Sequence, residues 1–137
     1  MTELERSPNV IETWVRTGFS GPGAVRIATA NTGRDGTGTI AEVCDGGPAG
    51  GRIDVVRAKA LETTTAGMIR FWLWDGGKWL LVGELLVTAV TASGTVASFE
   101  DNWEPGGGFL SLGPRQKFGA STNNGEAFSI MPEGGLY

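Results

Sequence analysis

The 137-residue chain has a net charge of −4, and its eleven lysines and arginines form no run, which argues against nucleic acid as a direct partner. Its single cysteine, Cys44, excludes an internal disulfide and is expected to be buried and inert, and the lack of histidine removes the commonest general base and metal ligand. We see no signal-sequence pattern and no apolar run near the roughly 18 residues of a membrane span, so we expect no membrane partner.

The first 23 residues differ in character from the rest. Ser7 and Pro8 form a helix-start signal and Gly18 a stop, yet the same segment is rich in β-branched residues that suit an extended arm. Both conformations stay open. We expect an N-terminal arm over residues 1–23, whose apolar side chains need a surface to lie on: Val10, Ile11, Trp14 and Val15.

From Ala24 onward, strand signals recur about every dozen residues between turn sequences. Most of the 23 glycines fall in clusters, which is typical of an all-β chain with many turns. We predict a two-sheet antiparallel β-sandwich over residues 24–137, jelly-roll-like in preference to immunoglobulin-like. The predicted strands cover residues 24–31, 38–44, 52–62, 68–74, 79–87, 95–102, 109–112, 117–122 and 127–131.

The stretch from Met68 to Val87 predicts a β-hairpin with Gly76 and Gly77 in its turn. A two-residue turn fixes which residues lie opposite one another. The expected cross-strand pairs are Trp74–Trp79, Leu73–Leu80, Trp72–Leu81, Phe71–Val82 and Met68–Leu85.

Both faces of this hairpin are apolar, whereas a strand with one solvated face alternates apolar and polar residues. We assign the face with Phe71 to the core and the tryptophan face to a protein partner. Arg70 supports this assignment, because its long stem can lie on apolar surface, while Glu84 on the core face argues against it. The expected core set is Phe71, Leu73, Leu80 and Val82. The expected interface set is Trp14, Arg70, Trp72, Trp74, Trp79 and Leu81.

Two alternative hypotheses for what covers the tryptophan face remain. The chain itself can cover it, with the N-terminal segment or with the loop from Asn102 to Gly113. A glycan can also stack on tryptophans, as on the aromatic platforms of carbohydrate-binding sandwiches. The expected neighbours Met68, Leu81 and Leu85 are apolar, however, which favours contact with protein.

Candidate catalytic residues are few. The densest acidic group is Glu100, Asp101 and Glu104, but adjacent strand residues point to opposite faces, so we expect solvated edge charges. The stretch "NTGRDGTGT" lacks the lysine of a phosphate-binding loop and the acidic spacing of a calcium loop, and we interpret it as a β-turn at Asp35–Gly36. We predict no cofactor, no metal site and no enzymatic activity.

Four stretches, in the order "ATANTGRDGTGTIAEV", "ETTTAGMIRFWLWDG", "LLVTAVTASGTVASFE" and "ASTNNGEAFSI", carry a resemblance to a known family. In these the chain resembles the small β-sandwich virion proteins of tailed bacteriophages and prophages. The clearest anchors are residues 63–68 and 120–128. They mark strand ends and turns, so they indicate kinship and carry no mechanism.

The resemblance implies a capsid decoration or cement protein that stabilises the shell by protein–protein contacts. It implies a homo-oligomer, such as a trimer, bound to the phage major capsid protein on the capsid surface after synthesis in the host bacterial cytoplasm. The alternative is a tail- or fibre-associated carbohydrate-binding β-sandwich module.

Overall fold

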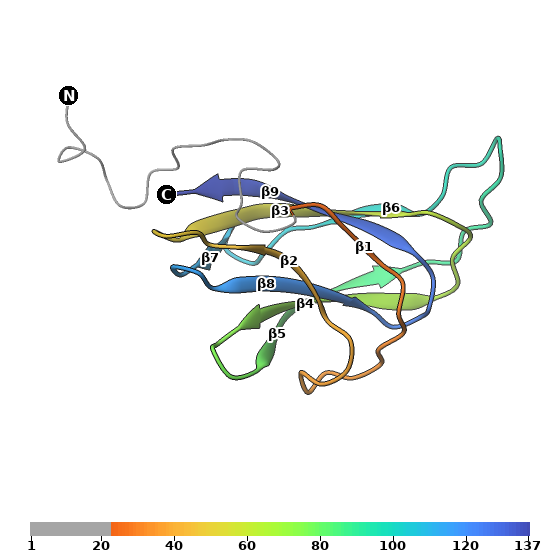
Figure 1. Cartoon of the computed structure of the whole chain (residues 1–137). Helices are drawn as coiled ribbons and strands as arrows, with labels where there is room; N and C mark the ends of the chain where they lie inside the picture. The colour runs from red at the N-terminus through yellow and green to blue at the C-terminus, as the bar shows by residue number, and fades with distance from the viewer. Residues whose placement is uncertain (1–22) are drawn as a thin grey trace, which may run out of the picture.

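The protein is all-β in the computed structural model, which describes residues 23–137 (Figure 1). The predicted arm with Trp14 lies outside these residues except for Gly23. The strands are β1 (Val25–Ile27), β2 (Ala41–Asp45), β3 (Gly51–Ala60), β4 (Gly67–Trp74), β5 (Trp79–Val87), β6 (Glu100–Trp103), β7 (Leu110–Leu112), β8 (Lys117–Thr122) and β9 (Phe128–Leu136).

The strands form two antiparallel sheets that pack face to face (Figure 1). One sheet has the order β1-β9-β3-β6, with β7 also paired to β3, and the other has the order β2-β8-β4-β5. Strands β1, β2, β3 and β4 alternate between the two sheets. Among the nine described strands, β4 and β5 are the only consecutive pair that are neighbours in one sheet. This is the jelly-roll arrangement that the sequence predicts.

Strand β3 illustrates why these residues form a sandwich. Its apolar residues Ile53, Val56 and Ala58 are fully buried between the sheets. Charged residues stand between them, and Arg57 forms an ion pair with Glu133 of β9 at 2.6 Å. The alternation of apolar and charged residues therefore buries one face of the sheet and solvates the other.

Aromatic rings fill the middle of the sandwich. Phe71 stacks on Trp103 at 4.6 Å between ring centroids and on Phe118 at 5.8 Å. Trp103 comes from β6 and the two phenylalanines from the opposite sheet, so the contact of Phe71 with Trp103 joins the layers. Gly83 makes the approach feasible, because a Cβ at that position would overlap the indole of Trp103.

The predicted strands over residues 24–31 and 38–44 are shorter than expected and do not form a hairpin. β1 ends at Ile27 and pairs with β9, while β2 begins at Ala41 and pairs with β8 in the other sheet. The residues between them cross from one sheet to the other. The chain does bend at Asp35–Gly36, where the N–H of Thr37 donates to Asp35 Oδ1 at 3.1 Å and Gly36 has a positive φ of 90°, but this bend does not join two paired strands.

Candidate functional site

The turn of the β4–β5 hairpin forms as the sequence predicts. The carboxylate of Asp75 accepts hydrogen bonds from the backbone N–H groups of Gly77 at 2.9 Å and Lys78 at 2.8 Å. Gly76 has a φ of 95°, which glycine adopts without steric cost. The first three expected pairs, Trp74–Trp79, Leu73–Leu80 and Trp72–Leu81, are confirmed.

A β-bulge at Val82 changes the register beyond these pairs. Phe71 lies opposite Gly83, and Val82 has no partner on β4. The expected Phe71–Val82 and Met68–Leu85 pairs are therefore wrong. The shift moves Glu84 to the position opposite Arg70, on the outer face of the sheet, so a carboxylate does not face the core.

The expected core residues of the hairpin are confirmed only in part. Phe71 is fully buried, and Leu73 and Val82 pack against the core from partly buried positions, as expected. Leu80 is 44% exposed, so its assignment to the core is wrong. Leu85, expected on the tryptophan face, lies opposite Ile69 and is buried, because the extra residue reverses the faces.

Trp72 is buried inside the chain and not available to a partner. Its side chain is fully inaccessible, and its indole Nε1 donates a hydrogen bond to Ser121 Oγ at 2.9 Å. Both hydrogen-bonding groups come from the same outer face of neighbouring strands β4 and β8. The expectation that Trp72 would contact another protein is corrected by this burial.

Residues 31–40, which we call the strap, cover this outer face. The strap leads from the end of β1 toward β2 and runs beside the sheet that holds β4, β5 and β8 (Figure 1). Asn31 N–H donates to the carbonyl of Thr122 at 2.8 Å. Ile40 and Trp79 both close over Gly119, where a Cβ would lie 2.9 Å from each side chain. Neither the loop 102–113 nor a partner is needed to bury Trp72.

The side chain of Asn31 organises the strap. Its amide nitrogen donates to the carbonyls of Thr37 and Thr39, both at 3.0 Å, and its Oδ1 accepts the N–H of Gly33 at 3.0 Å. Asn31 was not among the expected functional residues. The sequence signal is an asparagine before a glycine-rich stretch, since asparagine side chains commonly close loops on backbone groups.

Arg70 and Glu84 fasten the strap to the hairpin. Arg70 is buried, donates to the carbonyl of Asn31 at 3.3 Å and forms an ion pair with Glu84 at 3.0 Å. Arg34 of the strap also contacts Glu84, at 2.7 Å. Its hydrogen bond and that of Arg70 lower the pKa of the Glu84 carboxyl. Arg70 therefore holds the strap, and its expected place at a protein interface is corrected.

Three expected interface residues remain partly at the surface. Trp74 and Trp79 are half-buried and meet edge to face, with 5.4 Å between ring centroids. Leu81 is also half-buried. Trp74 and Trp79 lie at the turn end of the hairpin, whereas Leu81 is the cross-strand partner of the buried Trp72.

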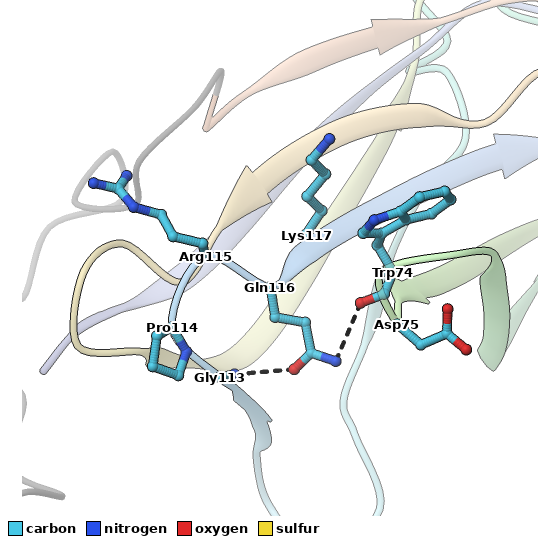
Figure 2. A pocket seen from close by; sticks show the side chains of 8 residues that line it. Trp74, Asp75, Gly113, Pro114, Arg115, Gln116 and Lys117 are labelled. Atoms are coloured by element: carbon cyan, nitrogen blue, oxygen red, sulfur yellow. Dashed lines mark hydrogen bonds between the residues drawn. The ribbon is translucent and has the colours of Figure 1, made fainter.

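A cavity of about 470 Å³ opens beside Trp74 (Figure 2). The strand end and turn of the hairpin form one wall, and the turn before β8 forms the other. Gln116 spans them: its Nε2 donates to the carbonyl of Trp74 at 3.3 Å, and its Oε1 accepts the N–H of Gly113 at 2.9 Å. The lining residues are Trp74, Asp75, Gly76, Gly113, Pro114, Arg115, Gln116 and Lys117.

The outer edge of β5 is another candidate contact surface. Among the strands of residues 23–137, β5 is the last of its sheet and has a strand neighbour on one side only. Leu80 is 44% exposed and Leu86 is 61% exposed along it. The strand contains one charged residue, Glu84, which is already bound by Arg34 and Arg70.

The two sequence anchors of the family resemblance, residues 63–68 and 120–128, meet at one corner of the sandwich. Asn124 donates from Nδ2 to Thr65 Oγ1 at 3.0 Å and to the carbonyl of Ala66 at 3.1 Å. Thr65 Oγ1 in turn donates to Glu126 Oε2 at 2.6 Å. These hydrogen bonds join the two loops and hold this corner of the sandwich together.

The remaining candidate chemistry is sparse. Glu100, Asp101 and Glu104 are exposed, as expected for edge charges. Within residues 23–137, no three acidic or cysteine side chains gather in a metal-binding arrangement. Burial raises the pKa of the Cys44 thiol, which keeps it protonated and unreactive.

The described part of the chain contains no helix that could span a membrane. Comparisons of the chain with family models, curated proteins and solved structures find no match.

Proposed function

We propose that this chain is a virion structural protein of a tailed bacteriophage. It acts as a decoration protein that assembles with copies of itself on the capsid surface and stabilises the shell through contacts with the major capsid protein. It works by burying surface and catalyses no reaction.

The observation that carries this proposal is the outer edge of β5, which has no strand beside it within residues 23–137. A strand at the end of a sheet offers unpaired backbone N–H and C=O groups to another chain. Edge strands that must stay single are commonly protected by charges, prolines or covering loops. Beyond the bulge, the segment Glu84–Val87 has one charge, satisfied internally, and its Leu86 side chain is 61% exposed.

Self-pairing of this edge would extend the sheet across two copies. An antiparallel β5–β5 contact satisfies the edge backbone groups of both chains and buries Leu86 of each. The fold and the resemblance support the same function at a coarser level, since jelly rolls are common in viral capsid proteins and also in lectins.

The oligomeric state of the full chain tests this surface. We expect light scattering after size-exclusion chromatography to give an oligomer for the unmodified protein. Leu86→Lys places a charge on the edge and should shift the population to monomer. Leu61→Lys is the matched control, because Leu61 is 51% exposed and lies outside β5.

The capsid contact needs a separate measurement. Co-sedimentation with empty shells, assembled from the major capsid protein of the phage that encodes this chain, should retain the unmodified protein and lose Leu86→Lys. A protein that stays monomeric at all concentrations and does not bind the shells would contradict the proposal.

A further inference from the structure

We propose that the cavity beside Trp74 binds a saccharide unit. This site lies at the hairpin turn and is independent of the proposed assembly role of the β5 edge. Its volume of about 470 Å³ falls within the roughly 300–1,000 Å³ that small-molecule sites occupy.

Trp74 supplies an aromatic surface that is held in place. Its indole is half-buried and meets the Trp79 ring edge to face, with 5.4 Å between the ring centroids, while Lys117 Nζ lies 5.8 Å from the Trp74 ring centroid. A pyranose ring has a face of C–H groups that can lie on an indole, whose face is electron-rich. Fixing the indole beforehand reduces the entropy that a ligand loses on binding.

The polar groups of the cavity match hydroxyl groups, which both donate and accept hydrogen bonds. Gln116 uses one N–H and one lone pair to join the two walls, and its amide retains a further donor and a further acceptor site. Lys117 adds donors. Asp75 at the rim is an acceptor, since backbone hydrogen bonds from Gly77 and Lys78 lower its pKa and keep it ionised.

This mixture argues against the other ligand classes. A simple anion would meet the Asp75 carboxylate at the rim, and the Lys117 ammonium already has a carboxylate partner in Glu42, at 3.8 Å. A purely apolar ligand would have to desolvate Asp75 and Lys117 without replacing their hydrogen bonds. A ligand with hydroxyl groups and an apolar ring face can bind the polar side chains of the cavity and the indole of Trp74 at the same time.

The wall opposite Trp74 is shaped by an unusual backbone conformation. Arg115 has a φ of 58°, the only positive value at a non-glycine residue among residues 23–137. Its N–H donates to the carbonyl of Gly47 at 2.8 Å, which holds the turn. Figure 2 shows the Arg115 side chain directed away from Trp74, so the residue forms the wall through its backbone.

A glycan array probed with the full-length protein tests the proposal, followed by calorimetry with the saccharides that bind. We expect at least one saccharide to bind, and Trp74→Leu to weaken that binding roughly tenfold or more by removing the aromatic face. Lys117→Ala, which keeps the hairpin intact, should also weaken it. Phe109→Ala is the matched control, because Phe109 is an exposed aromatic residue outside the cavity lining.

Thermal melting of each variant shows whether it remains folded. If Trp74→Leu does not fold, the saccharide binding of Lys117→Ala tests the proposal instead. An array without any bound saccharide overturns the proposal. Saccharide binding that survives both substitutions overturns it as well, since the ligand would then lie elsewhere. Light scattering on the same samples measures the oligomeric state, so a failure of saccharide binding can be distinguished from a failure of assembly.

Discussion

At the residue scale, Gly83 shows how one missing side chain joins the two sheets. It lies opposite Phe71 on β4, and Trp103 from the other sheet occupies the space that a Cβ would need. The indole reaches Phe71 at 4.6 Å only because this position is empty. The sequence shows a glycine inside an apolar strand, which indicates a bulge or a close approach, but it does not name the approaching residue.

We predict that Gly83→Ala destabilises the protein by roughly 1–3 kcal/mol, because the added methyl group overpacks the core against Trp103. Chemical denaturation followed by tryptophan fluorescence measures the change. Gly94→Ala is the control, since no atom lies within 4 Å of a Cβ at that position. Equal effects of the two substitutions would show that the Trp103 contact is unimportant.

At the scale of the element, the hairpin and the strap differ in how far the sequence predicts them. The turn and the first three pairs follow from local chemistry around Asp75 and the glycines, and they are confirmed. The bulge at Val82 brings Gly83 opposite Phe71 and against Trp103, which is distant in the sequence. The strap covers Trp72 through contacts between Asn31, Arg70 and Glu84, and hydrophobic periodicity carries no information about such long-range polar contacts.

The residues of the cavity beside Trp74 were likewise predicted only in part. Trp74 was expected at the surface because the face of the hairpin with Phe71 was assigned to the core and the tryptophan face to a protein partner. Gln116 and Lys117 were missed, since they belong to a strand end more than forty residues away and become its neighbours only through the β4–β8 pairing.

Gly36→Ala should loosen the strap. The position has a φ of 90°, and a Cβ there would overlap the carbonyl oxygen of Trp79. Gly76→Ala is the matched control, because its φ of 95° imposes similar backbone strain of about 1–2 kcal/mol in open space. We expect Gly36→Ala to lower stability more than Gly76→Ala and to increase acrylamide quenching of tryptophan fluorescence. Unchanged quenching would mean that the strap does not protect Trp72.

At the scale of the whole molecule, Glu84 connects the strap, β4 and β5 through Arg34 and Arg70. These arginines lower its pKa in the folded protein. A carboxylate with a lowered pKa stabilises the fold above its unfolded value, near pH 4.3, and loses that contribution as the pH falls through the folded value. The ionised network should therefore stabilise the protein most at neutral pH.

We predict that Glu84→Gln destabilises the protein by about 1–3 kcal/mol at pH 7, because buried Arg70 loses a charged partner. Stability curves of the two proteins should converge as the pH falls below about 4. Glu104→Gln, at an exposed position, should leave stability nearly unchanged throughout. A difference between Glu84→Gln and the parent that stays constant with pH would contradict the role given to the charge.

The pairing of β1 with β9 has a consequence for how the protein is made. β9 lies between β1 and β3, so one whole sheet lacks its central partner until residues 128–136 have left the ribosome. Folding must then wait for the end of synthesis of this domain and proceeds through contacts of long sequence separation, which are slow to form. In the interval the apolar β4 and β5 segments are exposed, and chaperones that shield such segments should raise the yield of folded protein.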